Sequence, residues 1–199
     1  MRKYFKITLG LIILFILIDL TIAFNKPTKF FELSIFEYPA NQALKNYPEL
    51  QNCRIQFIST GKRKIAHQAI PKFSSLLLPR KFRIYQIKIA EDQYGVLDST
   101  IYKNLENKSR IGVLGHELAH VLDYTDESSI SLIKKGVEYL TSEDYRIEYE
   151  RSTNCIAIKR NLKEEIKSWS KETHKYLQSD GRGKYYHSPN EIDKGIDCD

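Results

Sequence analysis

Cysteine and methionine are scarce in this chain. Its 199 residues include three cysteines and a single methionine, Met1. Cys53, Cys155 and Cys198 are too few and too scattered for a disulfide framework, and they lack the Cys-x-x-Cys spacing of a structural zinc site. One disulfide with one free thiol is possible, but the spacing does not select the pair.

A strong charge of one sign is also absent. The net charge of +6 is moderate, and basic residues gather only weakly, at residues 62–64, 80–81 and 182–184. No basic and aromatic pattern of a known nucleic-acid-binding module accompanies them. We therefore expect a solvated surface or attraction to an anionic membrane, and no nucleic-acid partner. The 42% hydrophobic and 12% aromatic content favours a packed globular domain over disorder.

Residues 1–24 have the pattern of an export segment. A basic start at residues 1–6 precedes an uncharged stretch at residues 7–18, and Asp19 is followed by the uncharged residues 20–24. A signal peptide could be cleaved near Ala23. An uncleaved signal-anchor, a transmembrane helix, needs about 20 largely apolar residues. An aspartate at the bilayer centre destabilises such a helix by roughly 2.5–3.5 kcal/mol, and the cost is smaller near the outer interface, where Asp19 would lie. We favour the anchor, and in both cases residues 25–199 are predicted to be extracytoplasmic.

One motif organises the rest of the chain. His116, Glu117 and His120 form the pattern His-Glu-x-x-His within a strongly apolar stretch. Residues four apart share one face of a helix, so both imidazoles can bind one metal ion, and Glu117 can act as general base toward a water molecule. Two histidines and a glutamate on so apolar a helix would be costly to bury without partners, which favours a metal site.

Two strands are predicted ahead of the motif. Residues 53–58 alternate, with Cys53, Ile55 and Phe57 on one face, and residues 82–90 are rich in aromatic and β-branched residues. We expect the two strands to be antiparallel. The second is a candidate edge to which an extended substrate could add, although it could equally be structural. The polar, basic stretch at residues 61–73, which contains His67, is predicted to be a loop with a solvated histidine.

Helical periodicity dominates the second half of the chain. Helices are predicted over residues 109–123, which carry the motif, and over residues 127–140, 143–161 and 163–177. Gly112 and Gly115 allow close backbone approach to the first of them. A capping box at residues 188–191 begins a last short helix. A further short helix could begin at Asp98, and Pro39 is expected to break the chain before a short helix over residues 41–47.

A catalytic zinc takes three protein ligands and leaves one position open. The metzincin class requires a glycine three residues after the second histidine and a methionine beneath the metal. Asp123 stands at that glycine position, although Asp126 falls at the ligand position, and Met1 is the single methionine. We therefore set this class aside and look for a glutamate on a later helix.

The helix predicted over residues 143–161 carries two candidate glutamates. Glu150 and Asn154 lie one turn apart on a face with apolar neighbours, whereas Glu148 lies on the opposite side, so we favour Glu150. The pair resembles the gluzincin pattern Glu-x-x-x-Asp, whose aspartate accepts a hydrogen bond from a ligand histidine and fixes its tautomer. Asn154 departs from that pattern, because its amide oxygen can accept the same bond but carries no charge.

Residues 109–162, about a quarter of the chain, resemble zincin-like metallopeptidases of the gluzincin type, in particular the small single-domain minigluzincins. The resemblance implies an α+β, zincin-like catalytic domain over residues 25–199, with the site-bearing helices packed on a small, mostly antiparallel sheet. It implies Zn²⁺ held by His116, His120 and Glu150, with Asn154 orienting a histidine. It also implies hydrolysis of peptide or protein substrates with Glu117 as general base.

Two other functions stay open. A degenerate zincin could act as a non-catalytic zinc-binding or membrane-tethered interaction domain, which the departure at Asn154 motivates. The same site could hydrolyse a non-peptide amide instead. The residue that would stabilise an oxyanion is left open among His187, Tyr124, Tyr139 and Tyr149. The oligomeric state is not predicted.

Overall fold

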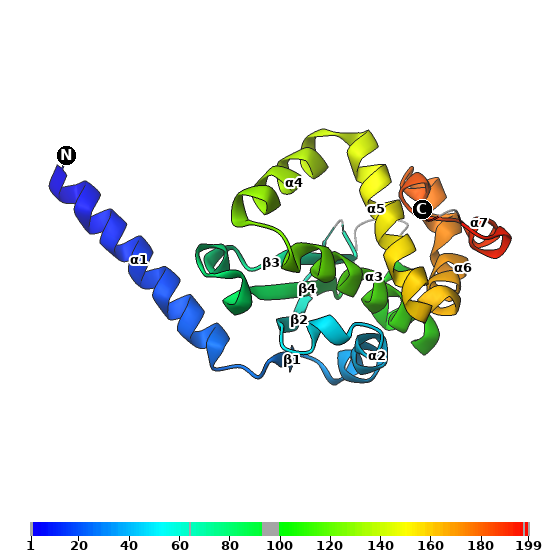
Figure 1. The fold of residues 1–199 in the computed structure, drawn as a ribbon, viewed down its shortest axis with the longest axis horizontal. Coiled ribbons are helices and arrows are strands. Elements are labelled where there is room, and N and C mark those ends of the chain that lie inside the picture. Colours follow the sequence, from blue (N-terminus) through cyan, green and yellow to red (C-terminus); the bar gives the residue numbers. More distant parts are fainter. Residues whose placement is uncertain (1, 64, 93–99, 197, 199) are drawn as a thin grey trace.

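A computed structural model of the chain describes residues 2–63, 65–92, 100–196 and 198, with side chains from residue 8 onward. An N-terminal helix, α1 (Arg2–Phe24), projects from a body in which helices surround a four-stranded sheet (Figure 1). This mixed architecture confirms the predicted α+β class. The helix start predicted at Asp98 lies outside the described residues.

The sheet is formed by strands that are mostly parallel. Its members are β1 (Lys29–Phe31), β2 (Arg54–Thr60), β3 (His67–Pro71) and β4 (Ile84–Ala90), in the order β1-β2-β4-β3. β2 pairs in parallel with β1 and with β4, and β3 pairs antiparallel with β4. The prediction of a mostly antiparallel sheet is therefore wrong. The connection from β2 to β4 contains β3, so the chain reverses twice and β2 and β4 run in the same direction.

The strand β3 occupies a stretch that was predicted to be a loop. His67–Pro71 shows no alternation of apolar and polar residues, and it ends in a proline, which is tolerated on an edge strand. β4 lies between β2 and β3, so the predicted role of residues 82–90 as a free edge is also wrong. β3 is the edge strand beside the helices.

The other helices are α2 (Ser34–Leu44), α3 (Asn107–Thr125), α4 (Ser129–Thr141), α5 (Glu143–Ala157), α6 (Lys163–Ser179) and α7 (Pro189–Lys194). The four long predicted helices correspond to α3, α4, α5 and α6. α5 ends earlier than expected in a π-helical turn, Ile158–Leu162, where Asn161 has a φ of 62°. Pro39 lies inside α2, so the predicted break there is wrong, whereas α7 begins with the predicted capping box.

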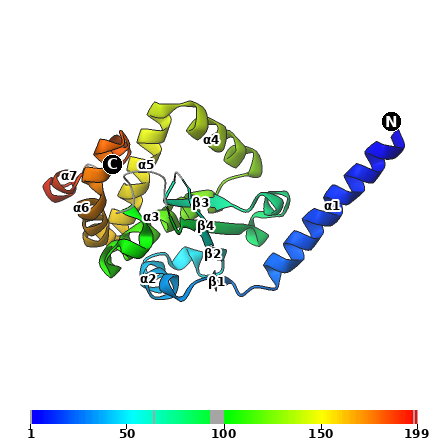
Figure 2. The ribbon, with the colours of Figure 1, turned by 180° about the vertical axis from the view of Figure 1, so that it is seen from behind.

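The helix α3 lies between the sheet and α6, as both views show (Figures 1 and 2). Its Leu114 and Leu118 are fully buried in the core. A side chain at Gly112 would collide with the Glu165 carbonyl oxygen of α6, which confirms the predicted close backbone approach. The Tyr47 hydroxyl donates to the Gly115 carbonyl oxygen at 2.6 Å, so α3 is held from the side of α2 as well.

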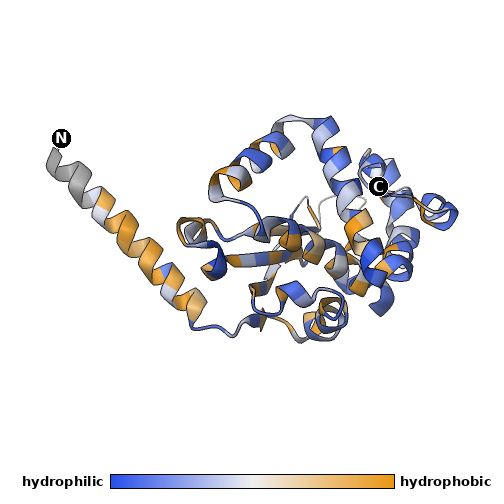
Figure 3. Ribbon diagram, viewed as in Figure 1, coloured by the Kyte–Doolittle hydropathy of each residue, from blue (hydrophilic) through white to orange (hydrophobic). Residues whose placement is uncertain are grey.

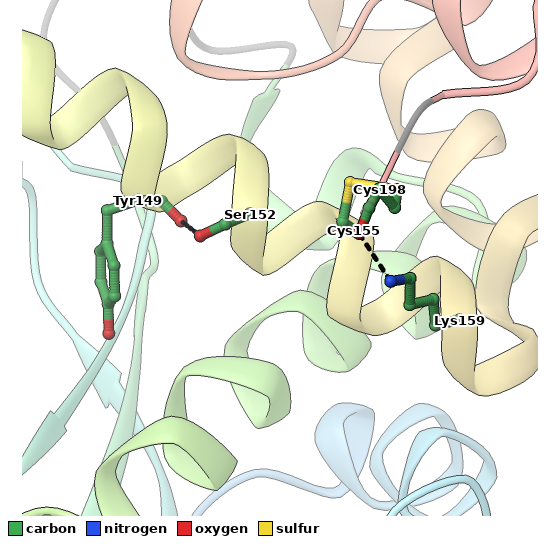
Figure 4. The surroundings of a disulfide bond; sticks show 5 residues. All are labelled: Tyr149, Ser152, Cys155, Lys159 and Cys198. Atoms are coloured by element: carbon green, nitrogen blue, oxygen red, sulfur yellow. Dashed lines mark hydrogen bonds between the residues drawn. A yellow bond between two sulfur atoms is a disulfide. The ribbon is translucent and has the colours of Figure 1, made fainter.

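The C-terminal tail is joined to α5 by a disulfide between Cys155 and Cys198 (Figure 4). Cys53 is a half-buried free thiol. The Lys159 ammonium donates to the Cys198 carbonyl oxygen at 2.6 Å, which adds a second link. The fold therefore selects the pair that the sequence spacing left open.

The helix α1 is apolar along most of its length, as its colouring shows (Figure 3). Among the residues that the structure describes, none of the helices is long and apolar enough to cross a membrane. The signal-anchor and signal-peptide interpretations both stay predictions.

Candidate metal centre

The helix α3 places two imidazoles on one face, as the sequence predicts. His116 and His120 are almost fully buried, and their Nε2 atoms lie 3.1 Å apart. The two rings meet edge to face, with centroids 4.7 Å apart. Trp169 of α6 packs against His116 at 5.4 Å between ring centroids, so the first imidazole is supported from the side of α6.

The third member of the cluster is Glu150 of α5. Its Oε2 atom lies 2.9 Å from the His116 Nε2 atom and 3.4 Å from the His120 Nε2 atom. Glu148, the alternative considered from the sequence, is exposed and lines a different cavity with Arg151. The fold thus brings Glu150, and not Glu148, to the histidines.

The three atoms fit one zinc ion. A tetrahedral ion with ligands at about 2.0–2.1 Å holds neighbouring ligand atoms roughly 3.4 Å apart. The Nε2 and Oε2 atoms of His116, His120 and Glu150 are separated by 2.9, 3.1 and 3.4 Å, so one ion can lie about 2 Å from all three. Burial alone would raise the pKa of Glu150, but the adjacent imidazoles of His120 and His116 lower it well below its ordinary value. The carboxylate is therefore ionised and suited to a cation.

The far nitrogen of each histidine faces an oxygen atom on α5. The His116 Nδ1 atom lies 2.8 Å from Asn154 Oδ1, and the His120 Nδ1 atom lies 3.3 Å from Thr153 Oγ1. The Thr153 hydroxyl donates to the Tyr149 carbonyl oxygen, which leaves Thr153 Oγ1 to accept from His120. With a metal ion bound, each imidazole would carry its proton on Nδ1, held by the oxygen atom on α5, and would turn the Nε2 lone pair to the centre.

The Glu150 carboxylate is oriented in the same way. The Tyr139 hydroxyl of α4 donates to Glu150 Oε1 at 2.5 Å, which leaves Oε2 directed at the histidines. Burial and the neighbouring Glu150 charge raise the pKa of Tyr139, so the hydroxyl stays protonated as a donor. Tyr139 was a candidate for oxyanion stabilisation, and the structure instead places it as a partner of the ligand carboxylate.

Glu117 lies beside the cluster with an unused oxygen. It is 5% exposed, and its Oε2 atom has no hydrogen-bond partner among the described residues. Burial raises the pKa of Glu117 to about 7, and the Glu150 charge acts in the same direction. An unpaired carboxylate oxygen with a raised pKa can act as a general base when a proton donor comes within hydrogen-bond reach.

A cavity of about 310 Å³ opens over the cluster between β3 and α4. Glu117, His120 and Glu150 lie in its wall, and the whole of β3 lines one side. Ala69 pairs with Ile87 in a position where its backbone groups point away from β4, and its carbonyl oxygen accepts from the Tyr124 hydroxyl at 3.2 Å. The edge of β3 therefore faces the site.

His67 is placed in this wall rather than in a solvated loop. Its Nε2 atom is buried without a partner among the described residues, and its ring meets Tyr102 edge to face. Burial lowers the pKa of His67 to about 3, so the imidazole is neutral. The prediction of a solvated loop histidine is wrong, because the stretch folds as β3.

The remaining candidates for an oxyanion donor are occupied elsewhere. The Tyr124 hydroxyl donates to Ala69, the Tyr149 hydroxyl donates to Asp123 at 2.8 Å, and His187 lies outside the cavity. Tyr186 was not among the predicted candidates, yet it lines the cavity with its ring 5.7 Å from that of His116.

The Tyr186 hydroxyl has no hydrogen bond to another described residue, and burial raises its pKa well above the ordinary value, with the Glu150 charge acting in the same direction. It is therefore a protonated donor without a partner in the site. Its sequence position, in a loop just before the capping box of α7, gave no signal of this placement. Thr153 was also missed, although it lies three residues after Glu150 on the same helix face.

Comparison of the chain with protein-family models, with curated proteins and with solved structures finds no match. The functional assignment therefore rests on the geometry and chemistry of the site itself.

Proposed function

We propose that this chain is a zinc-dependent metallopeptidase of the zincin-like, gluzincin type. The observation that supports this proposal is the convergence of His116 Nε2, His120 Nε2 and Glu150 Oε2 on one buried point. Two imidazoles and one carboxylate are a ligand set typical of catalytic zinc, and such a set leaves a position open for the reaction. The orphaned oxygen of Glu117 beside that point supports hydrolysis in particular.

Each ligand has its own orienting partner. Asn154 and Thr153 hold the Nδ1 protons of the two histidines, and Tyr139 turns the Glu150 carboxylate. Such partners fix the tautomer and orientation of the ligands before the metal arrives. Zinc, when bound, would act as a Lewis acid toward a peptide carbonyl group and toward a water molecule.

Glu117 moves the proton in this proposal. Its carboxylate accepts a proton from the attacking water molecule and then delivers it to the nitrogen atom of the leaving amine. A pKa near 7 suits both steps, because the group can take up and release a proton at neutral pH. The Tyr186 hydroxyl donates a hydrogen bond to the carbonyl oxygen of the scissile bond as negative charge develops there.

An extended peptide is the substrate that the cavity fits best. The edge of β3 offers backbone groups on the side away from β4, and a peptide strand can pair with such an edge. The scissile bond would then lie between β3 and the histidines of α3, close to Glu117. This assigns to β3 the role that the sequence suggested for residues 82–90.

The decisive experiment replaces Glu117 by glutamine. Glu117→Gln should keep about one equivalent of zinc and lose peptide hydrolysis by at least about 10²-fold, because the proton acceptor is removed while the ligands remain. Glu148→Gln, an exposed glutamate on α5, is the matched control and should leave both quantities unchanged. Metal analysis and cleavage of a peptide library measure the two quantities. Full activity in Glu117→Gln would sink the mechanism.

A second candidate is a degenerate zincin that binds zinc without catalysis, as a membrane-tethered interaction domain. The observation that favours it is the neutral amide of Asn154 behind His116, where the gluzincin pattern has a carboxylate. One equivalent of zinc without cleavage of any peptide would support this alternative. Cleavage of a non-peptide amide by the same residues would change the substrate class alone.

We further propose that α1 anchors the chain in a membrane and that the body faces an extracytoplasmic space. The apolar character of α1 supports the anchor. The Cys155–Cys198 disulfide supports the compartment, because disulfides persist in oxidising surroundings outside the cytosol.

A further inference from the structure

Large apolar side chains are exposed on two neighbouring parts of the body. Phe73 and Leu77, at the two ends of the 3₁₀ turn η2 (Phe73–Leu77), are 81% and 75% exposed. Ile130, Ile133 and Val137 recur on one side of α4 and are all more than half exposed. We refer to these five residues as the apolar face. Exposed apolar groups in such number mark a surface that contacts a partner.

The two parts of the apolar face are held together by polar contacts. The Ser129 hydroxyl at the start of α4 donates to the Leu76 carbonyl oxygen of η2 at 2.6 Å. The buried Arg83 guanidinium donates to the Glu127 carbonyl oxygen at 2.6 Å and to Ser129 Oγ at 2.9 Å. These bonds involve the residues next to Leu77 and Ile130, so η2 and the start of α4 form one continuous surface.

The same surface is fixed to α1. The Lys72 ammonium lies 2.6 Å from Asp19 Oδ1, and the Ser74 hydroxyl donates to Asp19 Oδ2 at 2.6 Å. Asp19 is the one charged residue between positions 7 and 24, so its partners on the body account for a carboxylate in so apolar a helix. Charged groups within lipid-embedded helices are commonly paired in this way.

The position of Asp19 sets the depth of the apolar face. Phe24, the last residue of α1, lies five positions after Asp19, which is about 7.5 Å along a helix. η2 therefore lies beside the last turns of α1, not beyond its end. With the end of α1 placed at the membrane surface, Phe73 and Leu77 would lie near the boundary of headgroups and acyl chains, where amphipathic segments lie roughly 5–10 Å deep.

The charge around the apolar face and its position both favour a lipid surface as its partner. Arg80 and Lys81 are exposed just after η2, where they can meet anionic headgroups. Another side of α4, which carries Tyr139 and Lys135, lines the cavity over the metal centre. A lipid surface on the apolar face would therefore lie next to the mouth of the site.

We propose that the apolar face docks on the surface of a phospholipid bilayer with anionic headgroups, in which α1 is embedded. We infer in addition that the site acts on polypeptide segments presented at that surface. This second part rests on the proposed peptidase function, whereas the docking does not.

The docking is tested with the full chain in vesicles of phosphatidylcholine and phosphatidylglycerol. Single cysteines are introduced by Leu77→Cys or Ile133→Cys in a Cys53→Ser background and are labelled with an environment-sensitive fluorophore. Tyr38→Cys is the control, because Tyr38 is 59% exposed on α2, which lies near β1, at the opposite edge of the sheet from α4 (Figure 1). Spin-labelled lipids should quench the labels at 77 and 133 several-fold more than the label at 38.

Two results would overturn the docking. Equal quenching at all three positions would show that α1 alone touches the bilayer. A dimer in detergent that Ile133→Glu dissociates would assign the face to a second copy of the chain. Both measurements can be made on the Glu117→Gln variant, so they do not depend on hydrolysis.

The substrate class is tested by presentation of one peptide in two forms. With protein in vesicles, a lipid-anchored peptide should be cleaved at least ten-fold faster than the same peptide in solution. Phe73→Glu combined with Leu77→Glu should abolish that preference and leave cleavage of the soluble peptide unchanged. Equal cleavage of both forms by the unaltered protein would refute the substrate class. Cleavage of neither form would refute the peptidase function, and quenching would still decide the docking.

Discussion

Both histidines of the proposed metal centre have a neutral residue behind them. Asn154 and Thr153 accept the Nδ1 protons of His116 and His120 through an amide and a hydroxyl oxygen. A carboxylate in either place would strengthen the basicity of the imidazole, whereas a neutral oxygen fixes orientation alone. The proposed zinc site is therefore oriented without the additional charge that the gluzincin pattern supplies.

Substitution of Asn154 separates orientation from charge. Asn154→Ala should weaken zinc binding about 10–100-fold, because His116 loses the partner that fixes its tautomer. Asn154→Asp keeps the acceptor and adds a charge, so it should bind zinc at least as tightly as the unaltered chain. Competition with a chelator measures the affinity. Ser152→Ala, a change on the same helix outside the site, is the control, and equal affinity of Asn154→Ala and Ser152→Ala would contradict the role.

Tyr186 has an adjacent tyrosine that serves as a matched control. Tyr186→Phe should lower kcat for peptide cleavage about 10²–10³-fold, the usual cost of removing one oxyanion donor. Zinc content should not change, because the Tyr186 hydroxyl makes no hydrogen bond to His116, His120 or Glu150 in the structure. Tyr185→Phe removes a hydroxyl that bonds Glu143 at 3.2 Å and should have little effect on kcat. Equal kcat values for the two variants would exclude Tyr186 as the donor.

The sequence identified the residues of the cluster but not all of the residues around it. His116, Glu117, His120, Glu150 and Asn154 follow helical spacing, so local periodicity is enough to bring them to one face of α3 or α5. Tyr186 reaches the cavity from a loop, where no periodicity predicts the direction of a side chain. Its role depends on how α6 and the last loop pack, which is a long-range property of the fold.

At the scale of elements, α3 depends on close contact with α6. Gly112→Ala should lower the free energy of unfolding by about 1–3 kcal/mol or more, because the new methyl group meets the Glu165 carbonyl oxygen. At Gly136 of α4 an added methyl group meets open space. Gly136→Ala should therefore raise the free energy of unfolding by roughly 0.5–1 kcal/mol, because alanine has the higher helix propensity. Urea unfolding followed by circular dichroism measures both changes. A neutral Gly112→Ala would show that the two helices can move apart.

The helices were more predictable than the strands. Capping residues such as Ser142 mark where a helix begins, and the side chain of Ser142 accepts from the Tyr145 amide in the structure. The strand β3 carries no such local signal, because His67–Pro71 neither alternates nor is rich in β-branched residues. Its pairing with β4 and its burial under α3 hold it in place, and neither contact is visible in the local sequence.

At the scale of the whole molecule, the local sequence pattern could not predict the relative directions of the strands in the sheet. Residues 53–58 and 82–90 were identified as strands, but whether they run in parallel depends on the course of the chain between them. That course became clear only with β3, which inserts a reversal and leaves β4 between β2 and β3. The order of the strands therefore depends on long-range pairing, which the local sequence pattern does not encode.

The disulfide ties the C-terminal tail to the helix that carries Glu150, across 43 residues of sequence. Cys198→Ser should lower the free energy of unfolding by about 2–4 kcal/mol, because the unfolded chain gains the freedom of an open loop. Unfolding in urea without reductant measures the loss. Cys53→Ser should change it little, since that half-buried thiol has no disulfide partner.

The same disulfide also tests in which compartment the protein folds. If the body folds in an oxidising space, one reactive thiol per chain is expected. Protein denatured directly from cells under thiol-blocking conditions should therefore show one thiol, at Cys53. Three reactive thiols would contradict both the pairing and the proposed extracytoplasmic setting.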